Sequence, residues 1–251
     1  MPKFKLTIAY DGTAWQGWQA QQSGLGVQNA VHRALAELFP SHPEVTGSSR
    51  TDAGVHARGL VAHVEIPPDE LRMPVRHLPL AINALLPPDI RVMAVNRAPA
   101  TFHARFDAVS KEYRYEVWNH PSMDPLRRHR AWHVPQALDI AAMRQAAGAF
   151  VGRHDFRAFT ANRGGELRDP IRTLSRCAIR RSGHSLTFVL EGEGFLYKMC
   201  RGIVGTLVQI GQGRHPADAV PSMLASGDRR LTGANAPAHG LTLWQVRYPR
   251  P

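Results

Sequence analysis

The chain has 251 residues, of which 43% are hydrophobic and 20% are charged. These proportions are typical of a globular protein large enough to bury a core, and they exclude a wholly disordered chain. Lys and Arg number 31 against 20 Asp and Glu, so the formal net charge is +11. A charge this high favours a polyanionic partner, above all nucleic acid, although an arginine-rich solvated surface would give the same count.

The basic residues cluster within the chain rather than at one end of it. A basic groove therefore accounts for them better than a disordered arm does. The clusters are Arg127, Arg128 and Arg130, then Arg180 with Arg181, and finally Arg229 with Arg230.

The sequence shows no membrane span, no signal peptide and no disulfide pattern, and these features indicate its cellular compartment. No apolar run approaches the roughly 20 residues that a membrane span needs, and the first residues carry no long apolar core of a signal peptide. The two cysteines, Cys177 and Cys200, do not form a C-x-x-C pair. Two thiols in a chain of this length favour a reducing compartment, so we expect a cytoplasmic protein with no membrane partner.

Hydrophobic periodicity predicts the elements of the first half. Residues 3–10 alternate apolar and polar side chains, as a half-buried strand does, and residues 26–39 carry apolar side chains at helical spacing up to Pro40. The same criteria predict a strand over 59–66, a short helix over 78–86 and a strand over 90–96. The first half is thus predicted as β-α-β-α-β.

The second half loosely repeats this pattern. It is predicted to contain a strand over 111–118, a helix over 138–150, a hairpin of 174–181 with 184–191 around Ser182 and Gly183, a helix over 197–210 and a strand over 241–248. We expect an α+β protein of two similar lobes, residues 1–105 and residues 106–251.

Templates for metal and cofactor sites are absent from the sequence. It contains no H-E-x-x-H, no C-x-x-C pair, no complete dinucleotide fingerprint, no phosphate-binding P-loop and no G-x-S-x-G. The clustered acidic ligands of a metal-dependent nuclease are missing too. We therefore expect no metal and no cofactor.

The densest polar stretch, residues 46–59, lies between a predicted helix and a predicted strand. Asp52 stands there between Arg50 and Arg58, with no second carboxylate close in sequence. Neighbouring guanidinium groups favour the ionised carboxylate, as a nucleophile or a base requires. The alternative is an Asx-turn with solvated arginines.

These residues belong to a longer pattern. Residues 50–57 read RTDAGVHA, which resembles the signature of the tRNA pseudouridine synthase A family. The resemblance continues, in the family's order, through YDGT at 10–13 with Trp15, Gly17, Trp18 and Gln19, FHARF at 102–106, KEYRY at 111–115, HDF at 154–156 and FLYKMCR at 195–201. Ser49 and Cys200 depart from the family's usual residues.

The resemblance implies a fold, an activity and partners. The implied fold has two RRM-like lobes whose sheets join into a central, mainly antiparallel sheet, with helices on one side and an active-site cleft between the lobes. The implied activity isomerises uridine to pseudouridine in the anticodon stem and loop of tRNA, at tRNA positions 38, 39 and 40 by the family's expectation. The implied enzyme is a metal-free homodimer that binds tRNA.

The resemblance also assigns roles to residues. Asp52 is the essential carboxylate, which either attacks the ribose C1′ or removes a ribose proton to give a glycal. Arg201 pairs with this carboxylate, although without the resemblance an ordinary exposed helix arginine would be preferred. Tyr113 stacks on the target uracil, whereas its alternation with Tyr115 and Val117 alone would predict core packing.

Three further substrate contacts are implied. Arg50 occupies the space that the flipped uridine leaves, Leu196 lines the uracil pocket, and Arg58 with the basic clusters contacts phosphates. A rival hypothesis is a non-catalytic RNA-binding protein of the same fold, which would keep the basic surface and would not need Asp52.

Overall fold

The computed structural model describes residues 1–161 and 169–249. They form two compact units. The first runs from Met1 to Val109 and also contains the C-terminal stretch from Thr242, and the second runs from Ser110 to Leu241. The last strand thus belongs to the first unit, whereas the sequence had placed residues 106–251 together in one lobe.

The sheet of the first unit is built around β1 (Lys3–Tyr10), which pairs antiparallel with a strand on each side. Every second residue of β1 is buried, as its alternating sequence predicts. The neighbours of β1 are β3 (His56–Glu65) and β4 (Ile90–Ala98). β3 also pairs antiparallel with the two-residue β2 (Thr46–Gly47). In addition, β3 pairs in parallel with β10 (Leu241–Arg247).

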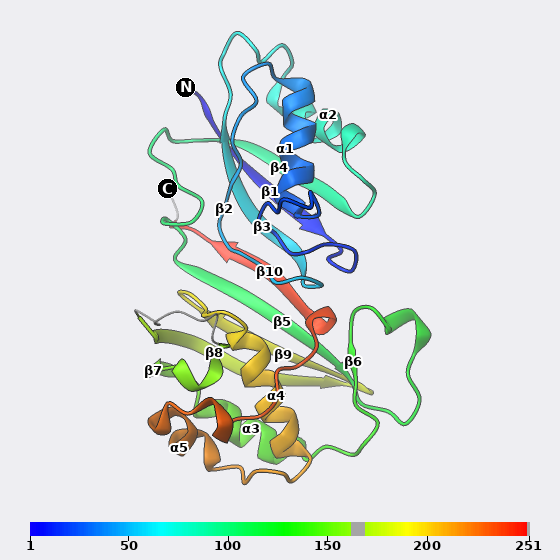
Figure 1. The fold of residues 1–251 in the computed structure, drawn as a ribbon, viewed down its shortest axis with the longest axis vertical. Helices are drawn as coiled ribbons and strands as arrows, with labels where there is room; N and C mark the ends of the chain where they lie inside the picture. Colours follow the sequence, from blue (N-terminus) through cyan, green and yellow to red (C-terminus); the bar gives the residue numbers. More distant parts are fainter. Residues whose placement is uncertain (162–168, 250–251) are drawn as a thin grey trace. The chain divides into compact units, whose positions relative to one another are not determined.

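Two helices pack on this sheet. Helix α1 (Val27–Leu38) buries residues at helical spacing, and it packs against α2 (Leu78–Leu85), which in turn packs on β4 (Figure 1). A single turn of 3-10 helix, η1 (Val75–His77), leads directly into α2. The apolar stripe of α1 therefore closes the core over β1, whose buried face includes Phe4, Leu6 and Ile8.

The second unit has its own antiparallel strands. β5 (Ser110–Trp118) pairs with β9 (Ser185–Gly192), and β9 forms a hairpin with β8 (Ile171–Ser182) whose turn holds Gly183 at φ +57°. β7 (Gly152–Asp155) pairs with β8, and the short β6 (Trp132–His133) pairs in parallel with β5.

Among the described residues of this unit, three helices accompany these strands: α3 (Ile140–Gly148), α4 (Met199–Gly211) and α5 (Ala219–Ser226). α3 packs against α4 and β8, whereas α5 packs against β7 (Figure 1). Nearly every residue of α4 is buried, so α4 is the central helix of this unit. The part of this unit that the structure describes also contains four single turns of 3-10 helix: η2 (Pro125–Arg127), η3 (Arg157–Phe159), η4 (Arg229–Leu231) and η5 (Ala238–Gly240).

The structure confirms an α+β chain whose strands pair mainly antiparallel, and each predicted helix and strand is present within a few residues of its predicted bounds. Three short strands, β2, β6 and β7, and helix α5 were not predicted. Among the residues that the structure describes, no helix has the length and apolar character to cross a membrane.

Candidate active site

Asp52 lies in the connection between β2 and β3, on a tight turn. The Val55 N–H donates to the Asp52 carbonyl at 3.1 Å, and Gly54 in between has φ +76°. A hydrogen bond spanning four residues with a left-handed third residue is typical of a type II turn, and glycine suits that position. Asp52 itself is half-buried on this turn.

Thr51, the residue before Asp52, is anchored to the core. The hydroxyls of Thr51 and Tyr10 are hydrogen-bonded at 2.8 Å, and the backbone N–H of Trp18 donates to the Thr51 carbonyl at 3.3 Å. The rings of Tyr10 and Trp18 stack with their centroids 6.4 Å apart. Burial raises the pKa of the Tyr10 phenol, so the group stays protonated as a hydrogen-bond partner.

The loop after β1 clamps the Asp52 turn through two glycines. Gly12 donates its N–H to His56 Nδ1 at 3.0 Å, and a Cβ on Gly12 would lie 2.1 Å from the Val55 carbonyl oxygen. Gly17 has φ +88°, and a Cβ there would lie 2.2 Å from the Thr51 carbonyl oxygen. Only glycine permits such an approach, so YDGT and Gly17 serve to hold the turn that carries Asp52.

The two arginines that flank Asp52 in sequence are both exposed. Arg58 extends from β3 and places its guanidinium 4.2 Å from the ring centroid of Trp244 on β10. This cation–π contact holds the Arg58 side chain against Trp244, which belongs to the same unit. Arg50 precedes the turn and presents its side chain to solvent.

Tyr113, on β5 of the second unit, is 7% exposed. Its ring meets the ring of Phe195 edge to face, with centroids 5.0 Å apart and an interplanar angle of 78°. Phe195 directly precedes Leu196 in the segment between β9 and α4. The structure therefore brings Tyr113 and the Leu196 segment together, and it adds Phe195, for which the sequence predicts no role of its own.

The same segment leads Arg201 into the first turn of α4. Lys198, in the left-handed conformation at φ +59°, precedes the helix, and Leu196 is 9% exposed. Arg201 is half-buried, and its Nε donates to the Ala236 carbonyl at 2.7 Å while the Ala236 N–H donates to the Arg201 carbonyl at 3.0 Å. Arg201 is thus a positioned side chain rather than an ordinary solvated helix arginine.

A buried tyrosine lies beside this arginine. Tyr115 donates its hydroxyl to the Pro237 carbonyl at 2.8 Å, and its ring fills the space where Gly240 lacks a side chain. Burial raises the pKa of Tyr115, and the charge of Arg201 opposes that rise. Residues 236–240 therefore hold both Arg201 and the strand that carries Tyr113.

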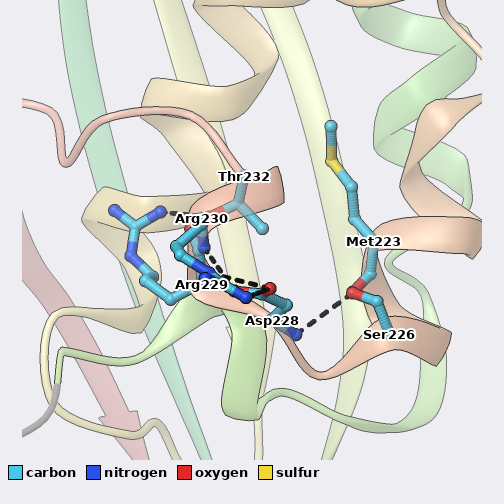
Figure 2. A network of polar contacts seen from close by, with 6 residues as sticks. All are labelled: Met223, Ser226, Asp228, Arg229, Arg230 and Thr232. Carbon is cyan, nitrogen blue, oxygen red and sulfur yellow. Dashed lines mark hydrogen bonds and ion pairs between the residues drawn. The ribbon is translucent and has the colours of Figure 1, made fainter.

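Part of the predicted basic surface is engaged within the protein. Figure 2 shows the turn after α5, where the guanidinium of Arg230 contacts both carboxylate oxygens of Asp228 and Arg229 contacts Thr232. Hydrogen bonds from Arg230 hold the pKa of Asp228 below its usual value. Ser226 completes the turn by donating to the Met223 carbonyl at 2.8 Å and accepting from the Asp228 N–H at 3.1 Å (Figure 2). Arg229 and Arg230 thus order this turn.

The cluster at 127–130 is also ordered locally. Arg127 lies 3.3 Å from Asp124 and 5.1 Å from the centre of the Trp118 ring, and Arg128 donates to the Pro125 carbonyl at 2.9 Å. Arg128 and Arg130 are exposed. Within residues 1–161 and 169–249, no three His, Cys, Asp or Glu side chains gather closely enough to hold a metal ion.

Comparison with known proteins places the chain. The sequence model of a family described as tRNA pseudouridine synthase matches residues 6–107 and 146–249. The chain is 42% identical over 248 residues to the tRNA pseudouridine synthase A of Geotalea uraniireducens, covering 99% of this chain and 100% of that protein. It is 43% identical to the protein of the same name from Bacillus subtilis, covering 98% and 99%.

Among solved structures, one match is the crystal structure of a Cbf5-Nop10-Gar1 complex, with a TM-score of 0.40 and 12% identity over 96% of this chain and 48% of that one. The family match and the full-length relatives decide the assignment. The chain belongs to the tRNA pseudouridine synthase A family, a family of isomerases.

Proposed function

We propose that the chain isomerises uridine to pseudouridine in the anticodon stem and loop of tRNA and that Asp52 is its catalytic carboxylate. The observation that carries this proposal is the Asp52 turn, which two glycines and a buried tyrosine–threonine pair hold rigidly. A fixed carboxylate is what attack on a ribose carbon, or removal of a ribose proton, requires. Membership in the family supplies the reaction.

The reaction sets the chemical tasks. The N1–C1′ bond breaks, the uracil rotates, a C5–C1′ bond forms, and the C5 proton leaves while N1 ends protonated. Substrate and product are isomers, so the balance needs no oxidant, reductant or co-substrate. Asp52 acts at the sugar, either by bonding to C1′ or by taking a ribose proton that it later returns.

The uracil is assigned to residues of the second unit. Tyr113, backed by Phe195, offers an aromatic face for stacking and a hydroxyl for proton transfer at C5. Leu196 contributes an apolar contact beside it. The resemblance to the family assigns Arg201 the task of keeping the catalytic carboxylate ionised and oriented. Within its own unit, the Arg201 side chain is held by its hydrogen bond to the Ala236 carbonyl.

RNA binding falls to the arginines. A stacked uridine must leave the helix to react, and exposed Arg50 fills the space it leaves. Arg58, held over Trp244, and the cluster at 127–130 contact phosphates, which position the RNA without reading its sequence. We further propose a cytoplasmic homodimer in which tRNA contacts both subunits.

Release of tritium from tRNA labelled at uracil C5, without added metal, tests the catalytic assignment. Asp52→Asn keeps the size of the side chain and removes its charge, so we expect release to fall to background while tRNA affinity changes little. Asp69→Asn, at an exposed position of the same unit, is the matched control and should behave as wild type.

Turnover by Asp52→Asn within tenfold of wild type would contradict the assignment. Wild-type protein that binds tRNA but releases no tritium would support the rival, a non-catalytic RNA-binding protein.

A further inference from the structure

Phe106 is a large aromatic side chain on the surface of the first unit, and it is 75% exposed. It belongs to a short turn, residues 103–107, that follows the last strand of the N-terminal β-α-β-α-β stretch. Exposure of a whole phenyl ring is unfavourable in water, so what holds the ring there and what could cover it are both informative.

The turn beneath Phe106 is rigid. His103 Nδ1 accepts the N–H groups of Arg105 and Phe106, each at 3.2 Å. The carboxylate of Asp107 accepts a hydrogen bond from the backbone N–H of His103 at 2.8 Å, and the backbone N–H of Asp107 donates to the His103 carbonyl at 3.1 Å. This pattern leaves Phe106 little freedom to fold inward.

Two contacts fix the turn to the body of the unit. The Ala104 N–H donates to Nδ1 of buried His63 on β3 at 3.1 Å, and the Tyr248 hydroxyl donates to the Ala104 carbonyl at 2.6 Å. Phe106 is therefore displayed from an anchored turn rather than from a loose loop.

The ring is backed by other rings on one face. Phe106 stacks on His103 with centroids 4.3 Å apart and planes 30° apart, and His103 in turn meets His63 at 4.9 Å. This ladder supports the inner face of Phe106. Its exposed fraction shows that most of the ring remains open to a partner.

The chemistry around the ring favours a nucleobase as that partner. The guanidinium of Arg105 lies 5.7 Å from the centre of the Phe106 ring, so an aromatic surface and a cation stand side by side. Aromatic rings beside cations are the means by which proteins stack unpaired bases while they neutralise the adjoining phosphates. The net charge of +11 points to the same kind of partner.

We propose that Phe106 is a stacking platform for an unpaired base of the RNA substrate, with Arg105 on the neighbouring phosphate. This inference rests on the proposed function for the identity of the RNA. It assigns to the 103–107 turn a role in holding the substrate, separate from the chemistry assigned to Asp52.

Binding of an unmodified tRNA transcript by Phe106 variants tests the proposal. Loss of base stacking in Phe106→Ala should weaken binding roughly 5- to 150-fold. Phe106→Tyr should retain the affinity. Phe106→Leu keeps an apolar cover over His103 but loses the aromatic face, so it should lose affinity as the alanine variant does. Leu80→Ala on α2, where Leu80 is 72% exposed, is the control for removal of an exposed apolar side chain and should bind as wild type.

The salt dependence of tRNA binding distinguishes the contribution of Arg105 from that of Phe106. Arg105→Gln should reduce the slope of log K against log salt by about 0.7 to 0.9, the value for one phosphate contact, whereas Phe106→Ala should leave the slope unchanged. A Phe106→Ala variant that lowers the slope as Arg105→Gln does would overturn the stacking role.

Two other results would overturn the proposal. The first is wild-type affinity in Phe106→Leu, which would mean that Phe106 only covers His103. The second is dissociation of an oligomer in Phe106→Ala, seen by light scattering without RNA, which would make the ring a contact between copies of the chain. If the wild type and Leu80→Ala bind tRNA but release no tritium, the proposed function is contradicted. The stacking proposal is still tested in that case, because it depends on the comparison of binding constants and not on turnover.

Discussion

Replacement of Gly17 by alanine should impair catalysis as well as stability, because the missing side chain of Gly17 lets its backbone pack closely against the turn that carries Asp52. Gly17 has φ +88°, and an added Cβ would lie 2.2 Å from the Thr51 carbonyl oxygen. Thr51 is the residue before Asp52, so a shift of its carbonyl to relieve this clash would move the turn that carries Asp52.

The size of the effect follows from these numbers. A Cβ is essentially never found closer than 3.0 Å to such an atom, so the backbone at Gly17 and the Thr51 carbonyl must separate by at least about 0.8 Å. A misplacement of about 1 Å at a catalytic group can cost roughly 10²-fold in rate. The left-handed backbone adds a stability cost of about 1–2 kcal/mol for alanine.

Gly24 offers a matched control in the same loop. It has φ +73°, and a Cβ there would meet only Arg33 Nη1, at 3.5 Å, which is ordinary contact. Gly24→Ala should therefore show only the stability cost of the left-handed backbone in urea unfolding and keep its activity, whereas Gly17→Ala should lose more stability and roughly 10²-fold in kcat/KM in the tritium-release assay. Equal activity of the two variants would refute the argument that the glycine clamp positions Asp52.

Three further predictions concern other parts of the molecule. In Tyr113→Phe, the uracil should still detach from the ribose, but product formation should slow, as followed by rapid-quench analysis of the RNA. Unchanged kinetics would show that the Tyr113 hydroxyl takes no part in proton transfer, although its ring could still stack on the uracil. Charge reversal at Arg127 and Arg128 should weaken tRNA binding and reduce its salt dependence with little effect on the chemical step, and a binding constant that does not vary with salt would contradict this. Burial, followed by the charges of His103 and Lys3, holds the pKa of His63 below its usual 6.5, and the charges of Glu65 and Asp107 oppose this shift. As pH falls below about 6.5 the unfolded chain takes up a proton that folded His63 does not, so the free energy of unfolding should fall by up to about 1.4 kcal/mol per pH unit. His63→Asn, which can still accept the Ala104 N–H, should flatten this decline in urea titrations between pH 5 and 8, and an unchanged profile would contradict it.

Elements with a strong repeating pattern could be predicted from the sequence, and the weak ones could not. β1 alternates over its whole length and α1 carries a full apolar stripe, so local pattern was sufficient for both. β2 and β6 have two residues each, too few to show a period. α5 contains Pro221 in its first turn, which local reasoning treats as a helix breaker although the position tolerates it.

The candidate site divides in the same way. The polar stretch around Asp52 could be found because its residue types are unusual in so short a span. The clamp could not be predicted, because Gly12 and Gly17 meet residues about 35 to 45 positions away and nothing local announces their partners. The contact between Arg201 and Ala236 spans 35 residues for the same reason. Phe106 carries no local signal either, since exposure depends on the whole fold.

The return of β10 to the first unit has a consequence for synthesis on the ribosome. β10 pairs with the start of β3, at Thr242 against His56 and Leu243 against Ala57, next to the turn that bears Asp52. The ribosome must make residues 110–241, 132 residues, before this strand emerges, which takes roughly 7–26 s at about 5–20 residues per second. During that delay the nascent chain exposes an unpaired strand edge of β3, a surface that invites incorrect pairing. Completion of the first unit therefore waits for the last residues to be translated, and chains released early would lack the strand that borders the Asp52 loop.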